Sequence, residues 1–253
     1  KKMFLFEESQ LLKKIQKRKI NSKDAKWISN FNEIKKGPVV FFGNEFFDAI
    51  PVKQFKKLKN SIFEKNYTIE KNYKIRQVFK KASASNVRDI NSYKILKKLK
   101  FIEYPKLGFL ELDRVVKKIK NLSGGVLLID YGYQNALNTS TIQAVMKNKK
   151  MSMKNLINNL GKVDVTSLVN FSLLKEYFFK KKLKVKKIFS QKFFLEKMGI
   201  IERAKIIQKK MNNQQRKSMF LRLKRLLHKD SMGELFKVIF CYNSKKNSFL
   251  GFD

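Results

Sequence analysis

The sequence has few of the side chains that build metal and nucleophile sites, since its 253 residues include one cysteine and one histidine. A zinc site of about four Cys and His ligands is therefore excluded. Cys241 has no second thiol with which to pair, which excludes an intramolecular disulfide and fits a reducing compartment. We expect Cys241 to be a buried free thiol. We expect His228, at the end of a basic helical segment, to stabilise that helix end rather than to act as a catalytic base.

Long apolar runs and arginine are also scarce. No run approaches the roughly 20 apolar residues that a membrane-spanning helix needs, so no membrane span is predicted. Of the 58 basic residues only 8 are arginine, which leaves 50 lysines spread along the chain. Because bidentate recognition of phosphate favours arginine, we interpret the net charge of +38 mainly as a solvated surface, with nonspecific polyanion binding as a side effect.

One short apolar run with a polar end predicts a central strand and a ligand site. Residues 39–42, Val-Val-Phe-Phe, are typical of a strand that is buried on both faces of an open α/β sheet. Asn44, Glu45 and Asp48 follow directly, and ligands of open α/β sheets bind beyond the carboxyl ends of the strands. Burying such polar groups without partners is costly, which favours a ligand site. The alternative is a strand followed by an ordinary surface loop.

Two further segments place carboxylates at predicted strand ends. Residues 124–129 form a turn and a fully apolar strand that ends at Asp130. Residues 3–7 form a short apolar strand that ends in Glu7, and a helix capped by Ser9 follows. A carboxylate at the tip of such a strand accepts hydrogen bonds from ribose hydroxyls in dinucleotide-type sites. The alternative for Glu7 is that it only caps the helix.

The predicted organisation is an α/β core, residues 1–55 and 108–253, with an insertion at 56–107. Within the insertion, residues 62–80 alternate loosely between apolar and polar side chains. This pattern predicts a β-hairpin that shapes a substrate mouth, with a turn at Glu70-Lys71-Asn72.

The second part of the core is predicted to be mostly helical. Residues 108–113 precede a helix that runs through Lys120. Residues 202–227 predict one long amphipathic helix or a pair, and an antiparallel edge strand follows through Phe240.

Several motifs together resemble one protein family. Residues 44–51, Asn-Glu-Phe-Phe-Asp-Ala-Ile-Pro, resemble the NEFFDALP signature of the MidA family of S-adenosylmethionine-dependent methyltransferases, which includes complex I assembly factor 7 of mitochondria. Residues 124–132 resemble the family's Gly-Gly motif that ends in Asp-Tyr-Gly. Residues 161–171 resemble Gly-x-x-Asp-Leu-Thr-x-x-Val-Asp-Phe, with Asn170 in place of the usual Asp, and residues 232–238 resemble Met-Gly-x-Leu-Phe-Lys-Val.

The resemblance implies a class I methyltransferase fold, a Rossmann-like open sheet, with S-adenosyl-L-methionine as the cofactor. It implies that Glu7 binds the ribose and that Asn44 is a second cofactor contact. It also implies that Glu45 and Asp48 grip a guanidinium group and take its proton during transfer. Four further residues are expected to line the substrate side: Glu111, Asp130, Asp164 and Thr166. The structural alternatives are a carboxylate near a helix N-terminus for Glu111, and a helix cap for Asp164 and Thr166.

A first strand and a glycine-rich turn belong to such a fold, and the sequence does not contain them. None of its 10 glycines forms a G-x-G-x-G cluster. We therefore expect the chain to begin at the second strand of the sheet and to bind S-adenosylmethionine very weakly by itself. A targeting peptide would not be visible in such a sequence.

The predicted function is methylation of an arginine side chain of a protein, such as a respiratory-complex subunit, in a bacterial cytoplasm or alternatively in the mitochondrial matrix. No metal is expected. One alternative is a nucleic-acid methyltransferase, which the net charge and Asn44 favour and which predicts stacking of a flipped base on Phe46 and Phe47. The other is a non-enzymatic assembly or binding protein, which the missing glycine-rich turn favours.

Overall fold

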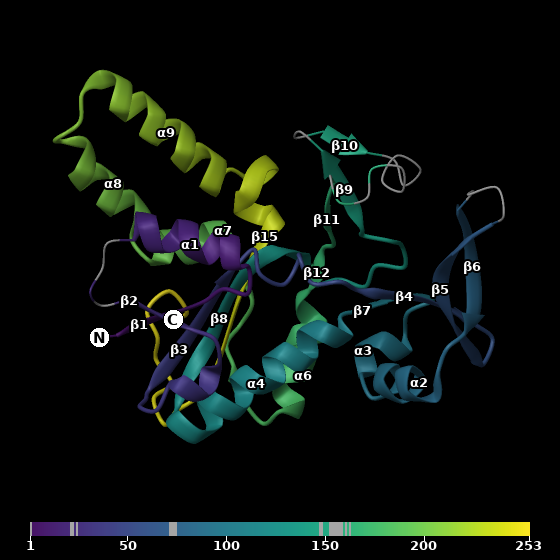
Figure 1. The fold of residues 1–253 in the computed structure, drawn as a ribbon. Coiled ribbons are helices and arrows are strands. Elements are labelled where there is room, and N and C mark those ends of the chain that lie inside the picture. The colour runs from purple at the N-terminus through teal and green to yellow at the C-terminus, as the bar shows by residue number, and fades with distance from the viewer. Residues whose placement is uncertain are drawn as a thin grey trace.

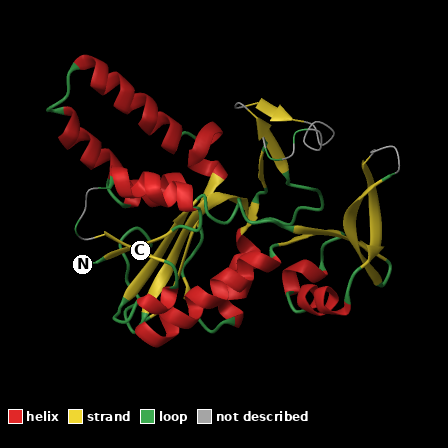
Figure 2. Cartoon of the chain, in the orientation of Figure 1, coloured by secondary structure: helices red, strands yellow, loops and turns green. Residues whose placement is uncertain are grey.

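The computed structural model describes residues 2–20, 23, 25–70, 75–146, 149–151, 159, 161 and 163–253. Within these residues the main sheet has six strands (Figures 1 and 2). Its two longest strands, β8 (Gly124–Tyr133) and β15 (Phe236–Asn243), are antiparallel neighbours. Two strands pair in parallel with the other edge of β8: β3 (Val39–Asn44) and β12 (Val169–Asn170). Two short strands pair with β15: β13 (Lys184–Val185) and β14 (Phe189–Ser190).

β8 is the central strand of this sheet. Its side chains are apolar at most positions, and those of Val126 and Leu128 are buried in the larger of two hydrophobic clusters, whereas Ile129 belongs to the smaller one. At its start Gly124 has φ +125°, and a Cβ there would lie 1.8 Å from the carbonyl oxygen of Val39, so only glycine lets β3 and β8 begin side by side. The prediction that both apolar runs belong to one sheet is confirmed.

Two predictions about this sheet are wrong. β15 is not an edge strand, because β8 pairs with one of its edges and β13 and β14 pair with the other. β3 is buried on one face only: Val40 and Phe42 are 63% and 65% exposed, whereas Val39 and Phe41 pack against the core. A run of four apolar residues is apolar on both alternating faces of a strand, so it cannot tell one buried face from two.

Helices cover the two faces of the sheet (Figure 1). The larger hydrophobic cluster lies under α4 (Lys106–Leu122) and α6 (Phe171–Lys180), and the smaller lies under α7 (Gln191–Lys197) and the C-terminal residues. Beyond α7 a helical hairpin projects from the sheet, consisting of α8 (Ile200–Gln208) and α9 (Asn213–Leu227). The hairpin corresponds to the helix pair predicted at residues 202–227. His228 ends α9, and η2 (Lys229–Gly233) leads into β15.

A separate two-stranded sheet lies beside β3. β1 (Met3–Phe6) and β2 (Ala25–Ile28) are parallel and are joined through α1 (Gln10–Lys19). The Oγ of Ser9 accepts a hydrogen bond from the N–H of Leu12 (3.3 Å), which confirms the predicted cap. A short 3-10 helix, η1 (Phe31–Glu33), follows β2. In the part of the chain that the structure describes, no strand pairs with both β1 and β3.

The insertion is a four-stranded antiparallel sheet with two helices. Its strands lie in the order β6 (Ile75–Lys81), β5 (Ser61–Ile69), β4 (Lys53–Leu58) and β7 (Phe101–Tyr104). Its helices are α2 (Ala84–Asn91) and α3 (Lys94–Lys97). The predicted hairpin is therefore present as β5 and β6, and the turn predicted at residues 70–72 lies partly outside the described residues. Because α4 begins at Lys106, residues 108–113 lie inside that helix and not before it.

A third, small sheet follows β8. Its strands are β9 (Gln143–Met146), β10 (Lys149–Met151) and β11 (Asp164–Thr166), with β9 in the middle. None of the helices in the described ranges is long and apolar enough to cross a membrane. Cys241 of β15 is fully buried, and burial raises the pKa of its thiol, so the prediction of a buried free thiol is confirmed.

Candidate functional site

The residues after β3 form a tight turn, which the carboxylate of Asp130 holds in place. Asp130 lies in β8 and is 1% exposed. Its Oδ2 accepts hydrogen bonds from the backbone N–H groups of Phe47 (2.7 Å) and Asp48 (3.2 Å). Its Oδ1 accepts one from the N–H of Tyr131 (3.0 Å). One buried side chain therefore joins the ends of two neighbouring strands that are distant in the sequence.

The turn itself begins with a strained residue. Glu45 has φ +49°, in the left-handed region, which costs a residue other than glycine roughly 1–2 kcal/mol. Its N–H donates to the carbonyl oxygen of Ile129 (3.0 Å), so the bonding between β3 and β8 continues up to the point of reversal. Asn44 and Glu45 remain exposed after the reversal, and Asn44 Nδ2 donates to Glu45 Oε1 (3.4 Å). Asp48, three residues later, is only 6% exposed.

Four carboxylates surround this turn: Glu45, Asp48, Asp130 and Asp164. None of the ion pairs within the described residues involves any of the four. Burial raises the pKa of Asp48, and the charges of Glu45 and Asp164 raise it further. Burial and then the charge of Asp48 raise the pKa of Asp130 to about 7, against the opposing effect of its three N–H donors. A cationic group placed among these carboxylates would be strongly stabilised.

A second buried carboxylate, Glu103 of β7, was missed by sequence analysis. It accepts hydrogen bonds from Gln54 Nε2 (2.7 Å), from the N–H of Thr141 (3.0 Å) and from the Thr141 hydroxyl. Burial, and then the charge of Glu103, raise the pKa of Tyr133 to about 12. Glu103 therefore fastens the inserted sheet to the segment that follows β8. No motif in the sequence pointed to Glu103, because it stands in a four-residue strand outside the segments that resemble the family.

The expected substrate-side residues are not all at the turn. Asp164 and Thr166 are the two ends of β11, so the helix-cap alternative for them is wrong. Asp164 lies close enough to raise the pKa of Asp48, and the N–H of Ser167 donates to the carbonyl oxygen of Asp48 (3.1 Å). Glu111 lies inside α4, where it pairs with Arg114 (3.0 Å), and no described contact joins it to the turn.

Glu7, the expected ribose ligand, lies at the tip of β1. Its Oε1 accepts a hydrogen bond from the N–H of Ser9 (2.9 Å) and its Oε2 accepts one from Gln16 Nε2 (3.0 Å). Gln16 Oε1 in turn accepts one from Trp27 Nε1 (2.9 Å). These two bonds hold Glu7 beside the start of α1, whereas the N-cap of that helix is Ser9. Each carboxylate oxygen of Glu7 still has a lone pair with which to accept a bond from a hydroxyl.

A large groove separates the tips of β1 and β3. Its volume is about 1080 Å³, and apolar side chains of both strands and of α4 contribute most of its lining. Phe6 of β1 and Gly43 of β3 are among the lining residues. Glu7 directly follows Phe6 in the sequence, and Asn44 directly follows Gly43. Neither Glu7 nor Asn44 is itself among the lining residues of the groove.

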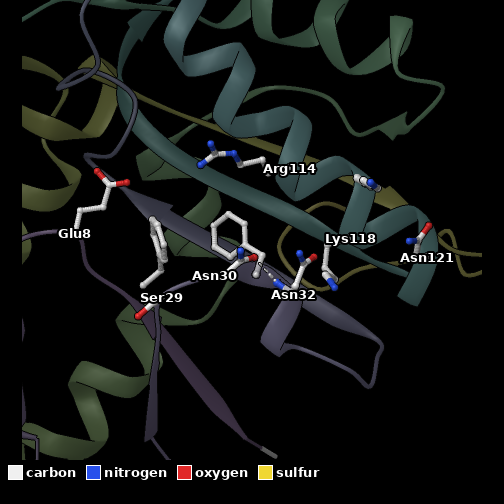
Figure 3. Close-up of a pocket in the computed structure, with 10 residues that line it drawn as sticks. Glu8, Ser29, Asn30, Asn32, Arg114, Lys118 and Asn121 are labelled. Atoms are coloured by element: carbon white, nitrogen blue, oxygen red, sulfur yellow. Dashed lines mark hydrogen bonds between the residues drawn. The ribbon is translucent and has the colours of Figure 1, made fainter.

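A smaller and more polar pocket of about 370 Å³ lies between η1 and α4. Figure 3 shows Arg114, Lys118 and Asn121 on the helix, facing Asn30 and Asn32 of the segment after β2. The Asn32 N–H donates to Asn30 Oδ1 (2.8 Å), and the Asn30 side chain takes part in a capping box of η1, so these amides have structural roles.

The residues present fit one end of S-adenosylmethionine. The Glu7 carboxylate offers acceptors for the ribose hydroxyls. The charged methionine end needs a cradle of backbone N–H groups such as a glycine-rich turn supplies, and none of the described residues around the groove forms one. Nor do the described residues include a group of three or more His, Cys, Asp or Glu that could hold a metal ion.

The sequence matches a family model and several named proteins. A model described as "Putative S-adenosyl-L-methionine-dependent methyltransferase" matches residues 1–189. The mitochondrial protein arginine methyltransferase NDUFAF7 homolog of Caenorhabditis elegans is 26% identical over 221 residues, which are 83% of this chain and 49% of that protein. The mitochondrial protein arginine methyltransferase NDUFAF7 of Danio rerio is 21% identical over 220 residues, 87% of this chain and 51% of that protein. The chain thus spans about half the length of these relatives.

The fold is similar to that of two crystal structures of Burkholderia thailandensis proteins. One was solved bound to S-adenosyl-homocysteine; its TM-score is 0.80 at 20% identity, and the match covers 99% of this chain and 66% of that one. The other, a native structure, has a TM-score of 0.81 at 19% identity and covers 99% of this chain and 68% of that one. Both are similar over the whole α/β fold described above. Since the family model matches well over half of its length, the chain belongs to the MidA-like family of S-adenosylmethionine-dependent methyltransferases.

Proposed function

We propose that this chain carries the acceptor side of an enzyme that transfers a methyl group from S-adenosylmethionine to an arginine side chain of a protein. The observation that carries the proposal is the cluster of four carboxylates around the turn after β3. Two of them, Asp48 and Asp130, are buried and have no ion-pair partner among the described residues. The names of the C. elegans and D. rerio relatives support arginine as the acceptor. Those two proteins are mitochondrial by name; for this chain the proposed compartment is a reducing one, a bacterial cytoplasm or the mitochondrial matrix.

An arginine acceptor needs a site of this kind because its guanidinium group is a planar cation with a pKa above about 12. Glu45 and Asp48 leave the turn three residues apart and grip the two outer nitrogens, which orients the group. When bound, S-adenosylmethionine supplies a methyl group that leaves the sulfonium sulfur without its bonding electron pair as a guanidinium nitrogen forms the new N–C bond. Asp48 accepts the proton that this nitrogen loses, and burial, which raises the pKa of its carboxyl, favours that role.

Other residues position this pair. Asp130 holds the backbone of Phe47 and Asp48 and so aims the Asp48 carboxylate. Asp164 and Thr166, at the ends of β11, line the substrate side. On the cofactor side, Glu7 binds the ribose and Asn44 contacts the cofactor from β3. Glu111 takes no part in this arrangement, because it pairs with Arg114.

A nucleic-acid substrate is disfavoured by the surroundings of the turn. Stacking of a flipped base was expected on Phe46 and Phe47. Phe46 is 41% exposed, but Phe47 is 3% exposed and its ring packs 6.2 Å from that of Phe109. A base therefore cannot reach the face of Phe47 without opening the core.

Binding of an arginine peptide tests the proposal without cofactor. A net-neutral peptide with one arginine is titrated calorimetrically into the 253-residue chain, beside the same peptide with citrulline, whose ureido group has a similar shape but no charge. We expect the arginine peptide to bind at least tenfold more tightly, because losing a charge-assisted contact to a buried cation costs about 2 to 5 kcal/mol. Asp48→Asn removes this difference, and Glu111→Gln, the matched control, keeps it. Equal affinity for the two peptides would contradict the proposal and favour a non-enzymatic binding role.

A further inference from the structure

We propose that the helical hairpin of α8 and α9 docks on an acidic surface of the substrate protein, next to the arginine that enters the carboxylate cluster. The contact is made by one face of α9, which carries Leu221, Arg222 and Arg225 and which we call the α9 face. The inference rests on the proposed arginine acceptor and extends it, because it specifies the surroundings in which that arginine is recognised.

The hairpin concentrates the scarce arginines of the chain. Residues 200–227 contain nine basic side chains and one acidic side chain, Glu202. Half of the 8 arginines of the whole sequence are among the nine: Arg203, Arg216, Arg222 and Arg225. All nine basic side chains are exposed, and none of them takes part in an ion pair that the structure describes. Because the planar guanidinium group binds a carboxylate through two parallel hydrogen bonds, this distribution favours recognition of carboxylates by the hairpin.

Apolar side chains lie among these arginines. Leu221 is 65% exposed and its neighbour Phe220 is 66% exposed, and neither helix of the hairpin contains a buried residue. Residues three and four apart share one face of a helix, which places Leu221 and Arg222 on the same side as Arg225. Aromatic residues and arginine are enriched at the centres of protein–protein interfaces. The α9 face therefore suits a protein partner that offers carboxylates beside an apolar patch.

The base of the hairpin lies at the end of the sheet that carries the carboxylate cluster. In the register of the sheet, Ser190 pairs with Lys237, and Lys237 pairs with Asp130. α7 begins directly after Ser190, and its first residue, Gln191, donates from Nε2 to the carbonyl oxygen of Leu226 in α9 (3.0 Å). The last turn of α9 is thereby held beside the strand ends from which the cluster is built, and Figure 1 shows the rest of the hairpin projecting away from the sheet.

Arg225 of the α9 face and Glu45 of the cluster act on the same tyrosine. Burial and the charge of Glu45 raise the pKa of Tyr131, and the charge of Arg225 acts against them. Tyr131 directly follows Asp130 in β8. A basic helix face and an acidic turn therefore lie next to each other at one end of the sheet.

This juxtaposition favours a substrate surface of mixed charge. Nucleic acid would bring phosphates against the four carboxylates around the turn as well as against the arginines of the hairpin, and like charges placed together are costly. A protein surface that presents one arginine among Asp and Glu side chains places its cation at the carboxylate cluster and its own carboxylates at the α9 face. Complementary charges of both signs also fix the direction in which such a surface approaches.

Four labelled peptides of equal length are the probe. Their central residue is arginine or citrulline, and their flanking residues are glutamate or glutamine. The affinity of each for the 253-residue chain is measured by fluorescence anisotropy at one ionic strength. We expect glutamate flanks to tighten binding about tenfold with either central residue, because several exposed charge pairs together reach that factor. The effect of glutamate reports on the hairpin, and the effect of arginine against citrulline reports on the carboxylate cluster.

Variants of the α9 face assign the glutamate effect to the hairpin. Arg222→Gln with Arg225→Gln should remove most of this effect and should keep the preference for arginine over citrulline, which depends on Asp48. Arg222→Lys with Arg225→Lys keeps the charge but not the planar fork, and should reduce the effect by about two- to threefold.

A matched control removes the same charge from the opposite end of the sheet. Lys245 and Lys246 follow β15, whose last residue, Asn243, pairs with Gly124 at the start of β8. Both lysines are exposed, and neither belongs to an ion pair among the described residues. Lys245→Gln with Lys246→Gln should therefore keep both the glutamate effect and the preference for arginine.

Three results would overturn the inference. Glutamate flanks do not tighten binding. The control pair and the Arg222→Gln, Arg225→Gln pair weaken the glutamate effect equally, which would assign it to the net charge of the whole chain. The arginine variant keeps the glutamate effect but no longer binds vesicles of anionic phospholipid, which would assign the α9 face to a membrane surface. Loss of the glutamate effect alone contradicts this inference, whereas equal binding of the arginine and citrulline peptides contradicts the proposed function.

Discussion

The tips of β3 and β1 carry the two halves of the proposed site, and their surroundings differ. The turn after β3 is tied to the central strand by Asp130, which is 1% exposed and accepts three backbone hydrogen bonds. Glu7 at the tip of β1 is half-buried and bonds only within its own neighbourhood, to Ser9 and Gln16. The acceptor half is therefore organised by the main sheet of this chain, whereas the cofactor half belongs to the two-stranded sheet of β1 and β2, which pairs with no other strand among the described residues.

The largest expected effect comes from removing the carboxylate that organises the β3 tip. Asp130→Ala leaves three N–H groups without their acceptor, two of them buried, and should lower the free energy of unfolding by about 3 to 5 kcal/mol. Glu7→Ala loses local, partly solvated bonds and should cost about 1 kcal/mol or less. Urea denaturation of both variants measures the two values. Equal losses would mean that the two tips are equally tied to the fold.

The second effect is a dependence of stability on pH at the β3 tip. The pKa of Asp130 is about 7 in the folded chain and 3.8 as the ordinary value, so the folded state binds the proton more tightly. The contribution of Asp130 to the free energy of unfolding is therefore greatest below about pH 4. This contribution decreases by about 2 to 4 kcal/mol as the pH rises to 7. Burial raises the pKa of Asp48 too, which acts in the same direction.

The comparison with Asp130→Asn isolates this contribution from the other titrating groups. The difference in unfolding free energy between the parent chain and this variant should decrease between pH 4 and pH 8. A flat difference for Asp130→Asn would show that the three N–H donors keep Asp130 ionised throughout.

A smaller effect is expected at Glu103, which ties the insertion to the core. Glu103→Gln replaces one acceptor oxygen with an NH₂ group that cannot accept from the Thr141 hydroxyl or N–H, and should cost about 1 to 2 kcal/mol. Glu111→Gln, which breaks a surface ion pair with Arg114, should cost about 0.5 kcal/mol or less. Thermal unfolding of the two variants compares them. A larger loss of stability for Glu111→Gln than for Glu103→Gln would mean that Glu111, and not Glu103, has the more important contacts.

The smallest effect is expected at the open edge of β3. Val40→Thr changes a side chain that is 63% exposed and should alter the stability of the chain alone by less than about 0.5 kcal/mol. Leu128→Ala, on the neighbouring strand and 3% exposed, should cost about 2 to 5 kcal/mol. A large loss for Val40→Thr would mean that the groove is already filled in solution.

The sequence was informative where a motif and a strand end coincide. The sequence predicted that the apolar runs of β3 and β8 lie in one sheet with Asn44, Glu45, Asp48 and Asp130 at their ends, because apolar runs with polar ends are typical of strands in open α/β sheets. That the two strands are direct neighbours came from the structure. Glu103 was not predicted, because its role arises from contacts with Gln54 and Thr141 that depend on the pairing of β4 with β7.

Two other differences between the prediction and the structure also arise from contacts that the local sequence does not encode. Glu111 was placed at the return of the insertion, but α4 starts five residues earlier, so the helix carries it onto its surface beside Arg114. The exposure of Val40 and Phe42 depends on what covers a strand, and the residues of the strand itself do not encode that.

The net charge of the chain bears on the edges of β1 and β3 that pair with no strand among the described residues. Exposed edges of this kind promote sheet-to-sheet association between copies of a protein. With a net charge of +38, however, copies of this chain repel each other at a distance, and salt screens that repulsion. The lysine-rich surface thus opposes aggregation of the chain through its strand edges. Raising the ionic strength should therefore make the isolated chain aggregate sooner.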